Sequence, residues 1–345
     1  QSLPVRIQIE ANRRCNLACL HCDIRHGQDT VLDGAAIERL LDALGGAAIE
    51  IMPYAGGEPT LAPLHELAPR LRRHNAFFSF TTNGVYTTRE WFEPIADCTG
   101  RMTISIHGST REIFDRIVPG GHFDTIARNM RDAVAVCERS GTQLLAGLVI
   151  MEPNVERLAE WFEWIADLGF RHAGLTNLYP GTSRLPELEP RRSGEQLAEL
   201  IGAGMEAAQR RGVYVETNVP EAYYTRWPGN RPTRATRYDV FGDVNGICSM
   251  FRPGFCPLVA NMITVEWDGT VLPCCRQRYP LGNLYREDFA ALWNGPRMRR
   301  LRETFLQRRL YSGCIQCREF FCDSEHPSQP PVTDLQRGFT DEFPT

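Results

Sequence analysis

The chain has 345 residues, 43% of them hydrophobic, and a formal net charge of −4. This length fits one large core with a smaller appended unit, since domains hold roughly 150 residues. The charge gives no basic surface for nucleic acid. All 38 basic residues are arginine, which excludes mechanisms built on a lysine imine. Without a signal peptide or a run of roughly 18 apolar residues, we expect a soluble cytoplasmic protein with neither nucleic acid nor membrane as a partner.

Short β-rich runs alternate with amphipathic helical patterns through residues 1–217, as in a parallel sheet covered by helices. Six β/α units are too few for the closed eight-stranded barrel, so an α/β fold with a partial (β/α)6 barrel is predicted, its chemistry on the loops at the carboxyl ends of the strands. The predicted strands are Val5–Ala11, Ile49–Tyr54, Phe77–Thr82, Arg101–Ile106, Leu144–Ile150 and His172–Leu178. The predicted helices are Gly34–Leu44, Leu64–Arg73, Thr88–Ala96, Thr125–Ser140, Val155–Leu168 and Glu195–Arg211, followed by a strand at Val213–Thr217.

The character of the chain changes after residue 217. Residues 218–255 are rich in Pro, Gly, Arg and aromatic residues without periodicity, which predicts a linker and substrate-facing loop. Residues 256–325 predict a cysteine-rich domain with a β-hairpin, Met262–Trp267 and Thr270–Leu272, turned at Asp268-Gly269. A helix near Met298–Gln307 completes this domain, and residues 326–345 form a polar tail without predicted structure.

Twelve cysteines in a chain of this kind favour metal ligation or catalysis over disulfides, because the cytoplasm is reducing. They form two groups: three between Cys15 and Cys22, and seven between Cys248 and Cys322. Cys98 and Cys137 lie between the groups in predicted helices, where we expect them to be buried as small apolar residues.

The first group, Cys15-x3-Cys19-x2-Cys22, directly follows the first predicted strand. Three thiolates can hold three irons of a 4Fe–4S cube, whose usual complement is four cysteines, and leave the fourth iron open. The same spacing also permits a zinc site with His21 or His26 as the fourth ligand.

The second group contains Cys256, then Cys274 on the far side of the hairpin, and later Cys314-x2-Cys317. Two thiol pairs brought together in this way can form a four-thiolate site for zinc or for an iron–sulfur cluster. Cys275, next to a candidate ligand, is expected to be a spare thiol.

The three-cysteine spacing resembles the signature of the radical S-adenosylmethionine (SAM) superfamily, in which the residue before the last cysteine, here His21, is often aromatic. The resemblance implies that the open iron of a 4Fe–4S cluster binds the amino and carboxylate groups of S-adenosylmethionine. One electron, from a donor such as flavodoxin or ferredoxin, then yields a 5'-deoxyadenosyl radical that abstracts hydrogen from the substrate.

Further segments resemble the cofactor-binding elements of that superfamily. Gly56-Gly57-Glu58-Pro59 is similar to the segment beside the methionine amino group, where Glu58 would accept a hydrogen bond from the ammonium. Related segments end the third and fourth strands, and relatives often carry an arginine where this chain has Val118, with Arg116 the nearest substitute. The implied cofactor-binding residues are His21, Gly56, Gly57, Glu58, Asn83, Ser105 and Arg116.

The C-terminal cysteines resemble the twitch form of the SPASM domain, in which four cysteines hold one auxiliary 4Fe–4S cluster. The implied ligands are Cys256, Cys274, Cys314 and Cys317. Leu281-Gly282-Asn283-Leu284 matches the domain too, and Leu292-Trp293-Asn294 is expected to start a helix. Cys322 resembles the next ligand of a two-cluster SPASM domain, but no cysteine follows it, so one auxiliary cluster is predicted.

Relatives of this type divide into peptide maturases and enzymes of natural-product pathways that act on sugars and related molecules. Peptide maturases often carry a leader-recognition domain before the barrel, and this chain begins almost at its first strand. We therefore expect a small-molecule or oligosaccharide substrate, with a peptide maturase and a non-catalytic protein with two zinc sites as alternatives. Candidate substrate contacts are Glu187, Glu189, Tyr223, Tyr224, Arg231, Arg234, Arg237 and Asp239.

Cys248 lies eight residues before Cys256 and fits no cluster pattern. Related sugar epimerases use a cysteine to return a hydrogen atom to the substrate radical, so Cys248 is the predicted catalytic donor, and epimerisation leads over dehydrogenation or decarboxylation. In deuterated water, wild type should place deuterium at the inverted carbon. Cys248→Ala should still form 5'-deoxyadenosine but lose the inverted product, as product mass spectrometry would show. Normal turnover by this variant, or a ketone product, would exclude Cys248 as the donor.

Overall fold

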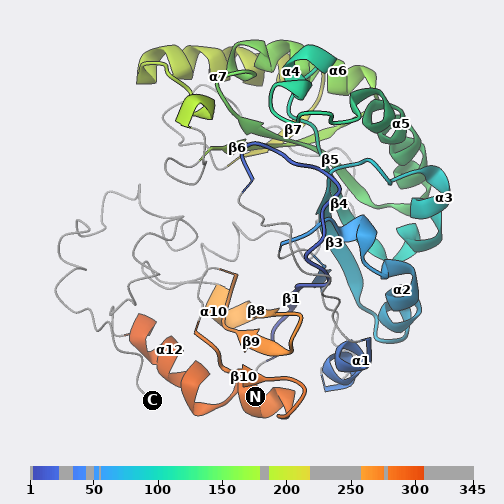
Figure 1. Ribbon diagram of the computed structural model, residues 1–345, viewed down its shortest axis with the longest axis vertical. Coiled ribbons are helices and arrows are strands. Elements are labelled where there is room, and N and C mark those ends of the chain that lie inside the picture. The colour runs from blue at the N-terminus through green and yellow to red at the C-terminus, as the bar shows by residue number, and fades with distance from the viewer. Residues whose placement is uncertain are drawn as a thin grey trace.

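The computed structural model of the chain describes residues 3–22, 34–43, 50–53, 56–178, 186–217, 258–275 and 279–306. These residues form one strongly curved sheet with the strand order β10-β9-β8-β1-β2-β3-β4-β5-β6-β7. The helices lie along its outer, convex side (Figure 1). The sheet does not close, because β7 and β10 stand at its two ends in this order. The α/β fold with a partial barrel is therefore confirmed.

Seven parallel strands form the barrel part of the sheet, in chain order from β1 to β7. The seventh strand, which follows the last predicted helix, pairs with β6 and extends the six predicted units by one strand. The strands are β1 (Arg6–Ile9), β2 (Glu50–Met52), β3 (Phe77–Thr82), β4 (Thr99–Ser105), β5 (Gln143–Ile150), β6 (His172–Asn177) and β7 (Tyr214–Thr217).

The long outer helices lie within a few residues of their predicted positions. They are α1 (Gly34–Ala43), α2 (Leu64–Arg73), α5 (Phe123–Ser140), α6 (Leu158–Asp167) and α7 (Gly194–Arg210). Local sequence sets their ends: Gly141 ends α5 at a φ of 76°, where glycine carries no Cβ penalty. Ser193 begins α7 with a reciprocal capping box to Gln196.

Two predicted helices each consist of an α-helix and a 3-10 helix in the structure, and the first of them is Thr88–Ala96. Residues Arg89–Phe92 form α3, and residues Glu93–Cys98 continue as a 3-10 helix. Pro94 lacks the N–H that an α-helical hydrogen bond needs, so the α-helix ends there. A 3-10 turn, Val155–Arg157, likewise precedes α6, and the structure adds a short helix α4 (Arg111–Asp115) capped by Thr110.

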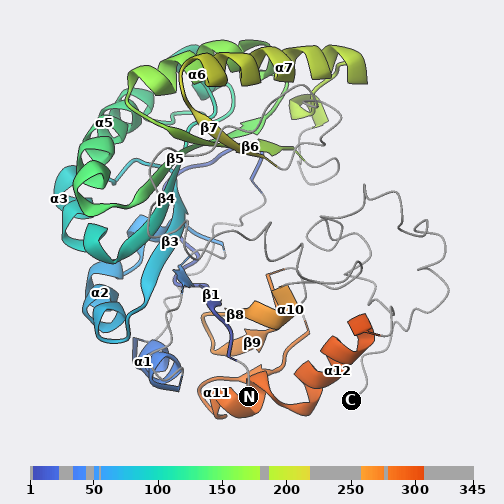
Figure 2. The same cartoon turned by 180° about the vertical axis from the view of Figure 1, so that it is seen from behind.

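The C-terminal strands continue the barrel sheet. The predicted hairpin is confirmed as β8 (Met262–Val265) and β9 (Thr270–Leu272), with Gly269 in the turn at a φ of 82°. β8 also pairs in parallel with β1, with Ile7 opposite Ile263. The hairpin therefore lies beside the first strand of the barrel (Figure 2), a placement that the sequence pattern does not predict.

Three helices and one short strand complete this unit: α10 (Leu258–Asn261), β10 (Gly282–Asn283), α11 (Phe289–Trp293) and α12 (Pro296–Leu306). The expectation that Leu292-Trp293-Asn294 starts a helix is wrong, because these residues end α11 and Asn294 is its C-cap. Asp288 begins α11 by accepting a hydrogen bond from Ala291 N at 3.0 Å. α12 begins at Pro296, a residue suited to a first helical position.

The described helices include none that is long and apolar enough to cross a membrane.

The pairing of β1 with β8 predicts that the barrel and the C-terminal strands unfold together. Ile263 is fully buried opposite Ile7, so Ile263→Ala should destabilise the whole fold by about 2–5 kcal/mol. Val5→Ala, at a side chain that is 45% exposed, is the control and should stay within about 0.5 kcal/mol of wild type. Thermal unfolding followed by circular dichroism measures both. An unchanged barrel transition in Ile263→Ala would contradict the single unit.

Candidate functional site

The three cysteines of the first group lie on the loop that leaves the carboxyl end of β1, as predicted. Cys15, Cys19 and Cys22 are all half-buried. The loop turns on itself through a hydrogen bond from Cys22 N to Cys19 O at 3.1 Å. It is tied to the segment after α4 by a bond from Leu20 N to Ile117 O at 3.0 Å.

The protonation of these thiols shows what the loop requires of a bound group. Burial raises the pKa of Cys15, and burial with the neighbouring Cys22 and Cys15 raises the pKa of Cys19 to about 12. Three thiolates so close together need positive charge to form, and irons supply it, since a coordinating thiol is deprotonated. The donor set therefore fits a three-cysteine cluster site.

The Gly56-Gly57-Glu58-Pro59 segment packs directly against the start of this loop. Glu58 N donates to Arg14 O at 2.7 Å, and Asn12 Nδ2 donates to Glu58 O at 3.0 Å. A Cβ atom at Gly57 would lie 2.5–2.7 Å from oxygens of Asn12 and Arg14. The second glycine is therefore required for the two loops to touch.

The Glu58 carboxylate, which is 3% exposed, accepts four hydrogen bonds from the protein. Its Oε1 accepts from Thr60 N, Thr60 Oγ1 and Thr82 Oγ1 at 3.1, 2.8 and 2.6 Å. Its Oε2 accepts from Asn83 N at 2.8 Å. Burial raises the pKa of Glu58, and these bonds oppose the rise. The carboxylate thus joins its own loop to the end of β3. The hydrogen bond from a cofactor ammonium to Glu58 stays a prediction.

Asn83 connects the end of β3 to the cysteine loop. Its Nδ2 donates to Asn16 Oδ1 at 2.7 Å and lies 3.9 Å from Cys15 Sγ, within the range of a weak N–H···S bond. Its Oδ1 accepts from Val85 N at 3.0 Å. Asn83, a predicted cofactor-binding residue, therefore contacts Cys15, the first cysteine of the loop.

Two histidines meet beside the last cysteine. The rings of His21 and His107 pack edge to face, with centroids 4.6 Å apart. Burial lowers the pKa of His21 to about 4 and that of His107 well below its usual value, so both rings are neutral near pH 7. His107 is held by Val149 N at 3.3 Å, and Nδ1 of His21 has no hydrogen-bond partner among the described residues.

Two other predicted cofactor contacts lie at the rim of this site. Ser105 is half-buried at the end of β4. Arg116 is exposed at the C-cap of α4, next to the Ile117 carbonyl that binds the cysteine loop, whereas Val118 is buried. Their assignment to the cofactor stays a prediction.

Of the C-terminal cysteines, Cys274 is buried and Cys275 is exposed, directly after β9. Cys98 and Cys137 are buried, as predicted. The candidate substrate residues Glu187 and Glu189 are exposed and half-buried, respectively. Residues that lie outside the described part of the chain are Cys248, Cys256, Cys314, Cys317, Cys322, Tyr223, Tyr224, Arg231, Arg234, Arg237 and Asp239.

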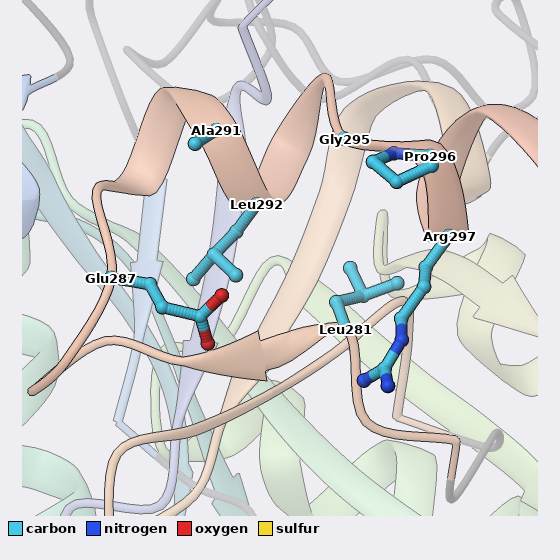
Figure 3. Close-up of a pocket in the computed structure, with 7 residues that line it drawn as sticks. All are labelled: Leu281, Glu287, Ala291, Leu292, Gly295, Pro296 and Arg297. Carbon is cyan, nitrogen blue, oxygen red and sulfur yellow. The ribbon is translucent and has the colours of Figure 1, made fainter. Parts of the chain in front are cut away.

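A cavity of about 360 Å³ lies on the C-terminal unit, between β10 and the helices α11 and α12 (Figure 3). It is lined by Leu281, Glu287, Ala291, Leu292, Gly295, Pro296 and Arg297. The carboxylate of Glu287 accepts from Asn283 N at 2.8 Å, and Arg297 donates to Pro280 O at 3.0 Å. Both charged groups thus have structural partners, and the bond from Asn283 occupies a donor of the edge strand β10.

Comparison with known families agrees with this site. Residues 9–165 match the radical SAM superfamily, and residues 256–318 match SPASM, an iron–sulfur cluster-binding domain. The three-cysteine loop on a curved parallel sheet thus defines a radical SAM domain. The chain therefore carries a radical SAM domain followed by a SPASM domain. Its cofactors are accordingly 4Fe–4S clusters and S-adenosylmethionine.

Two curated relatives match more than half of the chain. PqqA peptide cyclase of Ruegeria pomeroyi is 28% identical over 233 residues, 65% of this chain and 61% of that protein. Mycofactocin maturase MftC of Mycobacterium tuberculosis is 29% identical over 195 residues, 55% of this chain and 46% of that protein. The matches thus span about half to three-fifths of these relatives.

The fold is also that of Streptococcus suis SuiB. The crystal structure of SuiB bound to S-adenosylmethionine has a TM-score of 0.64 and 16% identity, and the match covers 92% of this chain and 72% of SuiB. SuiB bound to its precursor peptide SuiA gives a TM-score of 0.63 over 92% of this chain and 70% of that one.

The two adjacent glycines of this site should respond differently to alanine. Gly57→Ala should cost about 3 kcal/mol, because the new Cβ overlaps backbone oxygens that cannot move aside. Gly56→Ala is the matched control, since its Cβ would lie 3.4 Å from the nearest atom, in ordinary contact. Thermal unfolding of the cluster-free proteins measures the difference. Equal stability of the two variants would show that the loops do not pack as described.

Proposed function

We propose that this radical SAM enzyme modifies a peptide substrate. The observation that carries the proposal is the similarity of the chain to PqqA peptide cyclase, whose name gives a peptide as its substrate, and to mycofactocin maturase MftC. This proposal replaces the leading expectation of a carbohydrate substrate with the peptide-maturase alternative.

The inner wall of the barrel offers a place for a substrate group. Ser105, Gly147, Gly174 and Glu216 lie side by side in register across β4 to β7. Ile104, the residue before Ser105 in β4, lies with Ile126 of α5 beside Gly84, so its side chain faces the helices. Because successive side chains in a strand point to opposite faces, Ser105 and its row face the inside of the barrel. A Cβ at Gly174 would meet nothing within 4 Å. A Cβ at Gly147 would lie 2.9 Å from the Thr103 side chain, so the open part of this wall is at Gly174.

The far end of this row carries charge. Glu216 pairs with Arg101 through two hydrogen bonds, of 3.1 and 2.6 Å, across the inner face. Both side chains are only partly exposed, at 34% and 17%. The pair fixes two charged groups at the wall with a defined orientation, as bidentate pairs do. A polar peptide group entering the barrel would meet this pair beside the open surface at Gly174.

The roles of the chain's own residues follow from their contacts. When bound, the cluster and S-adenosylmethionine supply the capacity to abstract a hydrogen atom. Asn83 and Glu58 hold the cysteine loop to β3 and to the glycine segment. The neutral rings of His21, which is half-buried, and His107, which is buried, pack against each other beside Cys22. The residues thus hold the loops that would support the reacting groups.

The test uses the full chain, reconstituted anaerobically with iron and sulfide, with dithionite and S-adenosylmethionine. The probes are a library of short synthetic peptides, and mass spectrometry follows their mass together with 5'-deoxyadenosine. A peptide should change mass with wild type and remain unchanged with the Cys15→Ala, Cys19→Ala, Cys22→Ala triple variant. Turnover of an amino sugar or oligosaccharide but of no peptide would overturn the proposal. Stoichiometric zinc without iron would overturn the enzyme itself.

A further inference from the structure

Glu10 is a buried carboxylate, 5% exposed, that follows β1 and contacts both parts of the chain. Its Oε1 accepts a hydrogen bond of 2.8 Å from Nε of Arg13, which lies two residues before Cys15, the first cysteine of the loop. Its Oε2 accepts from Trp267 N at 3.3 Å, in the turn of the C-terminal hairpin. Its backbone N donates to Val265 O at 2.8 Å, at the end of β8.

The hairpin turn is held from its other side by the C-terminal unit. Tyr285 OH donates to Trp267 O at 2.9 Å, and Asn283 Nδ2 donates to Asp268 O at 2.9 Å. The backbone of Trp267 is therefore fixed at its carbonyl by Tyr285 and at its N–H by Glu10. A continuous series of hydrogen bonds runs from the loop around β10, through the turn and Glu10, to Arg13.

Charge adds to this connection. Arg13 faces Glu10 and also lies near Glu266 and Asp268 of the turn, and these carboxylates raise its pKa, with the Glu10 hydrogen bond as the largest cause and burial opposing it. Arg13 is thus the cation among three acidic side chains. A hydrogen bond between two charged groups is stronger than one between neutral groups, so this pair is one of the contacts that fix the base of the cysteine loop.

We propose that Glu10 is a positioning residue through which the C-terminal hairpin fixes the cysteine loop in the geometry that binds S-adenosylmethionine. In this proposal Glu10 acts through Arg13, which it holds two residues before Cys15. The inference depends on the cluster site of the radical SAM domain and is independent of whether the substrate is a peptide.

The test compares two buried glutamates on the same strand pair. Glu10→Gln keeps the size of the side chain, but Arg13 and Trp267 bond to different oxygens of Glu10, and the amide replaces one of these oxygens with an NH2 group that cannot accept. Glu50→Gln is the matched control: Glu50 is 4% exposed and pairs with Arg6 at 2.6 Å, in register at the opposite end of β1. A purely structural role predicts similar losses in both variants.

The readouts are iron content, thermal unfolding and the electron paramagnetic resonance spectrum of the dithionite-reduced, reconstituted enzyme during a titration with S-adenosylmethionine. We expect Glu10→Gln to keep wild-type iron content, to change the cofactor-bound signal, and to raise the Kd for S-adenosylmethionine about tenfold. Glu50→Gln should lose comparable thermal stability with an unchanged Kd. Equal Kd values in the two variants, with full iron content, would overturn the proposal.

A second variant tests the connection to the hairpin. A Cβ at Gly269, whose φ is 82°, would lie 2.7 Å from the Tyr285 ring, so Gly269→Ala should displace the turn. It should raise the Kd in the wild-type background and cause no further rise in Glu10→Gln. Additive effects would show that the hairpin does not act through Glu10.

If Glu10→Gln fails to hold iron, Arg13→Gln takes its place, because the Arg13 side chain is 36% exposed and its loss perturbs the fold less. Wild type without iron would refute the enzyme assignment and not this inference alone.

Discussion

The parallel pairing of β1 on both sides is the constraint on which the rest of the structure depends. β1 lies between β2, the next strand in sequence, and β8, which follows all seven barrel strands in sequence. The cysteine loop leaves the end of this strand, so its base is fixed by both neighbours. Contacts between residues so far apart in sequence carry a large loop-closure entropy, and burial of Ile7, Ile9, Ile263 and Val265 offsets it.

Beside the carboxyl end of this strand, three polar side chains bond to neighbouring loops. Asn12, Glu58 and Asn83 each join two loops, and the Glu58 carboxylate accepts four hydrogen bonds from the protein. A buried carboxylate without such partners would be costly. The same bonds hold three separate carboxyl ends of strands at one place, which is where a parallel sheet gathers its functional loops. The site is therefore rigid before any cofactor binds.

The fold itself says little about the substrate, since one fold supports many reactions. The expectation of a sugar-type substrate depended on the start of the chain and on linker residues. One of the relatives that resemble the chain in sequence, PqqA peptide cyclase, is named for a peptide substrate. In the proposed function a substrate group would lie near Gly174, in the row of Ser105, Gly147, Gly174 and Glu216, and would meet the Arg101–Glu216 pair.

The sequence by itself determined the local features: the periodicity of α5, the Asp268-Gly269 turn, the cysteine spacing, and the burial of Cys98 and Cys137. These depend on neighbours a few residues away. It missed the division of helix 88–96 at Pro94 and the cap at Asn294, where one residue decides an end. Only the tertiary structure decided that β8 joins β1, that Glu58 bonds to Thr82 and Asn83, and that Glu10 meets Arg13 and Trp267. Asn12 and Glu10 sit in the predicted end of the first strand as ordinary polar residues, and no spacing marks them, because their partners lie 46 and 257 residues away. Such contacts are set by the packing of the whole sheet, which no local pattern contains.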